Sequence, residues 1–85
     1  MLINDDLRAF LGVVRNHTIT EAAEILHITQ AALSIKIKKI EDQNGIQLFL
    51  RSRTGLTLTP EGEKLLSYVL QIEEMEEDWK KNQGV

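Results

Sequence analysis

The sequence predicts a mainly α fold, in which three short helices, a two-stranded hairpin and a long final helix follow one another. Three observations lead to this prediction. Apolar residues recur at helical spacing over the first 44 residues, the pattern changes to short runs rich in apolar residues and Thr between residues 47 and 58, and helical spacing then returns. Because the chain has 85 residues, we expect one compact core.

The first helix is predicted over residues 5–15. Leu7, Phe10, Leu11 and Val14 have the spacing that puts side chains on one helix face, and Asn4 can cap the start. The helix should end at the following asparagine and histidine, since both residue types accept a left-handed backbone more readily than most.

The second and third helices are predicted to form a helix-turn-helix. Thr18 and Glu21 form a capping box that begins a helix ending near residue 27, with an apolar face made of Ile19, Ala22, Ala23 and Leu26. Thr29 caps a third helix that runs to residue 43 or 44 and stops at Gly45. Its core face is formed by Leu33, Ile37 and Ile40. Two such helices joined by a short turn are typical of this motif.

A hairpin and a long helix complete the prediction. Residues 47–50 and 55–58 are the expected strands, separated by residues 51–54. Thr59 then caps a helix whose first turn contains Pro60, where the missing N–H has no cost. We expect this helix to continue to about residue 82, so that the chain divides into segments 1–59 and 60–85.

The final helix is predicted to pair with the same helix of a second copy. Its apolar residues alternate in spacings of three and four, which keeps one seam facing a partner helix. The seam comprises Leu65, Tyr68, Ile72, Met75 and Trp79, widened by Leu66 and Val69. A helix of about 22 residues extends roughly 33 Å, which exceeds the width of a small domain. The alternative, in which the helix folds back on its own core, stays open.

Composition limits the function classes. There is no cysteine, which excludes disulfides and thiolate chemistry. The two histidines, His17 and His27, fall at helix ends without a nucleophile spaced for either, so we expect no catalytic site, no metal site and no cofactor. No segment approaches the roughly 20 apolar residues of a membrane span, and no basic stretch leads into an apolar run at the N-terminus. We therefore expect a soluble, cytoplasmic protein.

The net charge of -3 conceals a basic middle segment. Residues 30–60 contain five basic and two acidic side chains, whereas residues 61–85 contain three basic and seven acidic ones. The acidic excess therefore lies on the long helix, and the positive charge lies on the third helix and the hairpin.

Three stretches together resemble the N-terminal domain of the LysR-type transcriptional regulators. They are residues 18–34 (TITEAAEILHITQAALS), residues 40–51 (IEDQNGIQLFLR) and residues 58–62 (LTPEG). The resemblance implies a winged helix-turn-helix that dimerises through a linker helix and regulates transcription by binding a partly palindromic operator. Family members carry an effector-binding domain after this helix; because the 85 residues include none, a small-molecule effector would act only through a domain outside them.

Two departures from the family pattern concern the DNA-reading helix and the hairpin. The family commonly has Pro where Ala31 stands and Arg where Ile35 stands, so a contact made by that arginine is lost. Many members have Gly then Arg where this chain has Arg53 then Thr54, which moves the basic tip by one residue.

The resemblance and the helical spacing together predict a DNA-binding surface. Helix 29–44 would enter the major groove of double-stranded DNA, where Gln30 can pair with adenine, Ser34 can reach a base or phosphate, and Ala31 and Ile35 can contact a thymine methyl group. The wing, residues 47–58, would lie at the backbone or minor groove. The remaining candidate contacts, mostly to phosphate, are Thr18, Thr20, Thr29, Lys36, Lys38, Arg51, Arg53 and Thr54.

Simpler interpretations of these residues stay open. Capping alone would explain Thr18, and Gln30 and Ser34 can be a cap or solvated surface. Arg51 can pair with an acid, and Ile35 can be an ordinary exposed apolar side chain. A winged-helix module that binds a protein instead of DNA, through the Ile35 face and the acidic helix, is the alternative function.

Overall fold

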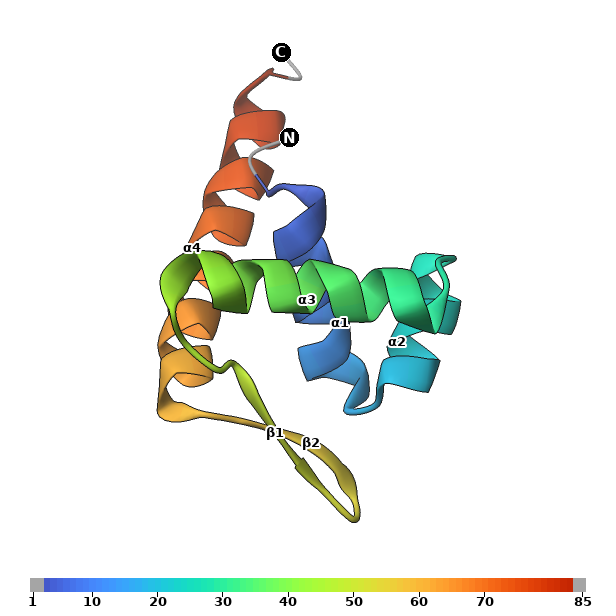
Figure 1. The fold of residues 1–85 in the computed structure, drawn as a ribbon. Coiled ribbons are helices and arrows are strands. Elements are labelled where there is room, and N and C mark those ends of the chain that lie inside the picture. The colour runs from blue at the N-terminus through green and yellow to red at the C-terminus, as the bar shows by residue number, and fades with distance from the viewer. Residues whose placement is uncertain (1–2, 84–85) are drawn as a thin grey trace.

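A computed structural model describes residues 3–83 and has the predicted mainly α architecture (Figure 1). Three helices precede a two-stranded antiparallel hairpin, and a long helix follows it. The elements are α1 (Asp5–Asn16), α2 (Ile19–Leu26), α3 (Gln30–Asn44), β1 (Phe49–Ser52), β2 (Gly55–Leu58) and α4 (Pro60–Gln83). The outermost residues of the two predicted segments, 1–2 and 84–85, lie outside the described range.

The predicted helix boundaries are confirmed by their caps. The side chains of Asn4, Thr18 and Thr29 each accept a hydrogen bond from the backbone N–H three residues later, at 2.8, 3.2 and 3.0 Å. These bonds satisfy donors that have no partner within the helix. The residues that follow α1, α2 and α3 adopt the left-handed backbone conformation, namely His17, His27 and Gly45.

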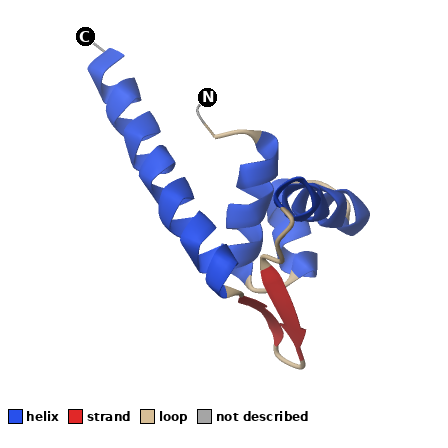
Figure 2. Cartoon of the chain, turned by 60° about the vertical axis from the view of Figure 1, so that its left-hand side comes forward, coloured by secondary structure: helices blue, strands red, loops and turns tan. Residues whose placement is uncertain are grey.

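The core lies where α1, α2 and α3 meet, and α4 covers it from one side (Figure 2). The predicted core face of α3 is buried, with Leu33, Ile37 and Ile40 at most 7% exposed. Both alanines of α2 are also buried, which allows the helices to approach closely. Phe10 of α1 packs against Phe49 of β1 with ring centroids 5.6 Å apart, so the hairpin is joined to the same core.

The first strand begins two residues later than predicted. Leu48 is fully buried, and its backbone groups are used outside the strand ladder: its N–H donates to Glu41 Oε2 at 2.8 Å and its carbonyl accepts from the N–H of Thr59 at 3.0 Å. The ladder therefore starts at the next residue and pairs Phe49 with Leu58. As a result, the turn shrinks from the predicted residues 51–54 to residues 53 and 54.

Helix α4 packs against its own core along one side and projects past it at its C-terminal end (Figures 1 and 2). Val69 is fully buried in that core, so placing it on the surface between two copies was wrong. The exposed apolar residues of the predicted seam are Tyr68, Met75 and Trp79, which are 52–60% exposed; Leu65 and Ile72 are half-buried. None of the helices within residues 3–83, α4 included, combines the length and apolar character needed to cross a membrane.

Candidate nucleic-acid interface

A groove runs between α3 and the wing, which we define as β1, β2 and the turn between them. It consists of two adjoining hollows of about 450 and 380 Å³. Four residues line both hollows and come from α2, α3, β1 and β2: Ile19, Ser34, Arg51 and Leu56. The groove therefore brings together three segments that the sequence predicted to contact DNA.

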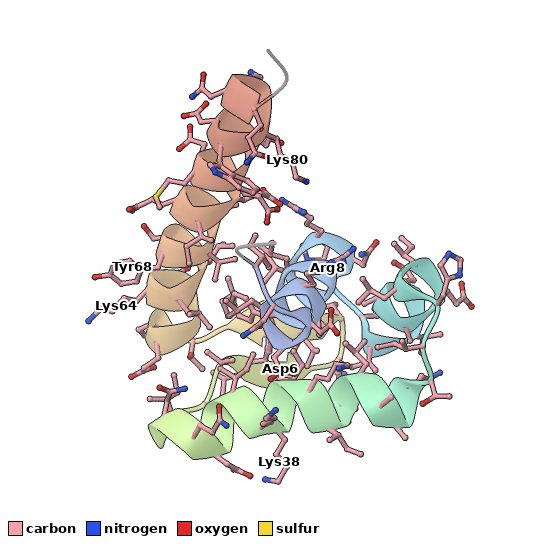
Figure 3. All side chains as sticks on the ribbon, turned by 90° about the horizontal axis from the view of Figure 1, so that it is seen from above. Asp6, Arg8, Lys38, Lys64, Tyr68 and Lys80 are labelled. Atoms are coloured by element: carbon pink, nitrogen blue, oxygen red, sulfur yellow. The ribbon has the colours of Figure 1, made fainter. Side chains whose placement is uncertain are left out.

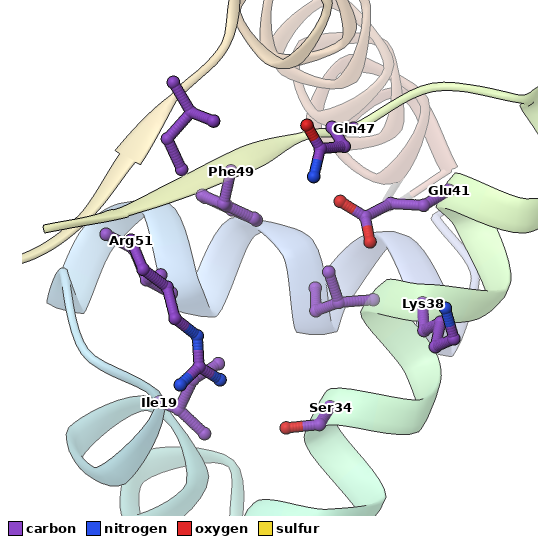
Figure 4. A pocket seen from close by; sticks show the side chains of 10 residues that line it. Ile19, Ser34, Lys38, Glu41, Gln47, Phe49 and Arg51 are labelled. Carbon is purple, nitrogen blue, oxygen red and sulfur yellow. The ribbon is translucent and has the colours of Figure 1, made fainter.

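Arg51 reaches into this groove because of its register in β1. Alternate residues of a strand face the same side, so Arg51 shares its side with Phe49, which packs on the core. Figure 4 shows the guanidinium of Arg51 and the hydroxyl of Ser34 directed toward each other from opposite walls. The ion pairs formed among residues 3–83 do not include Arg51, which disfavours a purely structural role.

The N-terminal ends of α2 and α3 form the other wall of the smaller hollow. Four of the predicted DNA contacts line it, namely Thr18, Thr20, Gln30 and Ala31. The Thr18 hydroxyl already accepts the capping hydrogen bond from Glu21. Its own proton is still available to donate, as is that of the Thr29 cap, so capping and phosphate binding are compatible at both threonines.

The lysines of α3 are divided between two sides of the helix. Lys38 is one of the residues that line the groove. Its side chain points outward from α3, and its ammonium lies 3.6 Å from Asp42 (Figure 3). Lys36 instead lies toward α1, where Asp6 is 3.9 Å from its ammonium and 3.3 Å from that of Lys39. Lys36 is thus outside the groove and two-thirds buried, so its predicted phosphate contact would lie apart from that of Lys38 and stays a prediction.

The wing is attached to the turn between α1 and α2. The N–H of Leu56 donates to the carbonyl of His17 at 3.1 Å, and Gly55 passes so close that a Cβ on it would lie 2.8 Å from the same oxygen. Gly55 also has a φ of +126°, which side chains other than that of glycine rarely allow. The sequence did not single out Gly55 or the groove residue Ser52; a glycine directly after the predicted turn was the available signal.

Arg53 and Thr54 form the exposed tip of the wing. The Ser52 hydroxyl lies 3.2 Å from that of Thr54 and donates to the carbonyl of Gly55 at 3.1 Å. These bonds connect residues on both sides of the turn, and both tip residues are exposed to solvent. The tip is thus a preformed basic projection at the end of the groove.

Comparisons with known sequences agree with this architecture. The family described as "Bacterial regulatory helix-turn-helix protein, lysR family" matches residues 4–63. The HTH-type transcriptional regulator HdfR of Salmonella newport (strain SL254) is 47% identical over 62 residues, which is 73% of this chain. The chain spans about a fifth of the length of the curated relatives it matches, since the aligned part covers 22% of HdfR.

Solved structures give the same result over nearly the whole chain. A structure described as "BenM_DBD/benA site 1 DNA Complex" is 32% identical, with a TM-score of 0.84, over 92% of this chain and 91% of that one. A "CbnR_DBD-DNA complex" is 26% identical, with a TM-score of 0.81, over 92% and 90%. The resemblance noted in the sequence is thereby confirmed, and the chain belongs to the lysR family of bacterial regulatory helix-turn-helix proteins.

Proposed function

We propose that the chain is the sequence-specific DNA-binding part of a transcription regulator, with α3 in the major groove and the wing against the backbone or minor groove. The observation that carries the proposal is the groove in which Ser34 of α3 and Arg51 of the wing face each other. Two relatives that align with 92% of the chain were solved as complexes with DNA, which supports DNA binding by this chain.

The charge distribution supports this orientation. Lys38, Arg51 and Arg53 lie on α3 and the wing, where they can bind phosphates. The acidic residues that make the net charge negative are mostly on α4, whose C-terminal end points away from the wing in Figures 1 and 2. The total charge of -3 is therefore compatible with binding a polyanion through the other end of the molecule.

The experiment is to select bound duplexes from a random DNA library and to measure affinity for the enriched sequence as salt is raised. We expect affinity to fall steeply with salt, since each neutralised phosphate releases counterions. Replacing Gln30, Ser34 and Lys38 together with Ala should abolish sequence preference. Lys64→Ala is the matched control, because this lysine points outward from α4 in Figure 3. Failure to enrich any sequence, or an unaltered preference in the triple variant, would refute the proposal.

The second part of the proposal is a homodimer formed through α4. Tyr68, Met75 and Trp79 are apolar, more than half exposed, and lie on one side of a helix that projects beyond its own core. Another copy of α4 can cover them, because a self-complementary apolar strip pairs with itself around a two-fold axis. Two linked readers also match a partly palindromic operator, since binding of the second half-site becomes intramolecular.

Sedimentation measurements test the dimer. Met75→Asp and Trp79→Ala should shift the protein toward monomer and weaken binding to a two-half-site duplex far more than binding to one half-site. Leu70→Ala is the control, because Leu70 is 43% exposed but lies on the far side of α4 from Trp79. A mass unchanged by Met75→Asp would contradict pairing through this face.

A further inference from the structure

Ile35 is the most exposed large apolar side chain among residues 3–83, at 68%. It lies on the outer face of α3, with the exposed Ala31 one turn before it and Lys38 and Lys39 after it. The strip formed by Ala31 and Ile35 is thus apolar on a helix face whose other residues are polar. Helix packing does not require an apolar residue at position 35, since the core face of α3 lies on the opposite side.

The surroundings of Ile35 connect it to the groove. Ala31 and Lys38 line the groove itself, and Ile35 shares an adjoining hollow of about 350 Å³ with Lys38, Lys39, Asp42 and Gln43. The two lysine ammonium groups are held near carboxylates, Lys38 at 3.6 Å from Asp42 and Lys39 at 3.3 Å from Asp6. Ile35 lies one turn before these two lysines on the outer face of α3, and its side chain is exposed to solvent.

The chemistry of isoleucine restricts what it can recognise on DNA. Its side chain has no hydrogen-bond donor or acceptor, so it cannot distinguish bases by the polar groups on their edges. The one apolar group that a base pair presents in the major groove is the C5 methyl of thymine. A cytosine that carries a C5 methyl group presents the same surface.

We propose that Ile35, with Ala31 beside it, reads the C5 methyl group of a pyrimidine in each half-site, an inference that rests on the proposed DNA binding by α3. The recognised chemistry is a 5-methylpyrimidine, supplied either by thymine or by 5-methylcytosine. Ile35 thereby acts as a specificity-determining residue through apolar contact instead of hydrogen bonding.

The test uses the 85-residue chain and the duplex enriched by selection, with each thymine replaced in turn by uracil. This change removes a methyl group and leaves every hydrogen-bonding group in place. At one or more positions we expect affinity to fall about fourfold, which corresponds to one buried methyl group. In Ile35→Ala the difference between thymine and uracil at those positions should disappear. Because Ile35 is exposed and Ala favours helix, this variant should remain folded, which circular dichroism checks.

The matched control is Ile25→Ala. Ile25 is 61% exposed on α2 and lines a different hollow, shared with Glu73 of α4. This variant should keep the wild-type ratio of affinities for thymine and uracil. Placing cytosine or 5-methylcytosine at the sensitive position separates the two sources of the methyl group. If the duplex with 5-methylcytosine binds more tightly than the one with cytosine, Ile35 recognises the methyl group of both bases. If the two duplexes bind equally, Ile35 recognises the methyl group of thymine alone.

Two results would overturn the inference and leave the proposed function intact. In the first, the wild-type chain binds the selected duplex equally well with thymine or uracil at every position. In the second, Ile35→Ala keeps the wild-type discrimination, so that the difference arises elsewhere. If no duplex is bound at all, the proposed function fails and the inference fails with it.

Discussion

Replacing Gly62 with alanine tests how α4 is attached to the rest of the molecule. Gly62 is buried in the first turn of α4, where its N–H donates to the Thr59 hydroxyl at 2.9 Å. A Cβ on Gly62 would overlap the carbonyl oxygen of Leu48 and lie 2.8 Å from Cδ2 of Leu58. Because the main obstacle is backbone, it cannot rotate away, and the start of α4 would have to move.

The expected loss can be worked out from these contacts. Forcing extra volume into a packed site costs about 1–3 kcal/mol, and a backbone obstacle puts Gly62 at the upper end of this range. Moving α4 also lengthens the bond from the Thr59 N–H to the Leu48 carbonyl, worth about 1 kcal/mol. Alanine regains about 1 kcal/mol through its higher helix propensity. We expect Gly62→Ala to lower the free energy of unfolding by about 3 kcal/mol.

Urea unfolding followed by far-UV circular dichroism measures this loss, at one protein concentration because association would add to stability. The matched control is Gly12→Ala in α1, where the nearest atom to an added Cβ is Cδ1 of Leu26, at 2.8 Å, the end of a flexible side chain. Strain and gained helix propensity should nearly cancel there. Equal stability of the two variants would refute the close seating of α4 on the Leu48 carbonyl.

Three further substitutions test the groove and its supports. Arg51→Ala should weaken DNA binding and reduce the slope of log affinity against log salt by about 1. The control Arg8→Ala, on α1 outside the groove, should change neither the affinity nor the slope. An unaltered slope in Arg51→Ala would exclude a phosphate contact by Arg51. Gly55→Ala should detach the wing, because it strains a positive φ and displaces a carbonyl, and faster hydrogen exchange of the Leu56 amide would report the detachment. Asp6→Asn should change the free energy of unfolding by less than about 1 kcal/mol. It should tighten DNA binding at low salt, because it removes a negative charge near Lys36 and Lys39. Weaker DNA binding by this variant would contradict the expected electrostatic effect.

Helix boundaries were predictable because they depend on residues close together in the sequence. A cap such as Thr18 or Thr29 bonds to an N–H three residues away, and Gly45 takes a left-handed conformation that glycine adopts without strain. The apolar face of α3 was predictable for the same reason, since helical geometry alone aligns Leu33, Ile37 and Ile40. The family resemblance added the function of these elements.

The errors concern positions where a distant segment decides which side of an element is covered. Val69 has the spacing of a seam residue, but α4 leans on its own core there, so this residue is buried within the chain. Lys36 and Lys38 are about 200° apart around α3 by helical spacing alone. The distant Asp6 only adds the carboxylate that lies near Lys36 on that side. The start of β1 was misplaced because Glu41 and Thr59 use the backbone groups of Leu48.

By itself, then, the sequence determined the order of the elements, their caps and their apolar faces, since all of these depend on local spacing. The motifs that resemble the lysR family also indicated the family, which the match over residues 4–63 confirmed. Tertiary structure alone decided that Arg51 and Ser34 face each other across one groove and that Gly55 anchors the wing to the α1–α2 turn. It also decided which half of the α4 apolar surface is left exposed. These features arise from contacts between residues far apart in the chain, and helical or strand periodicity contains no information about them.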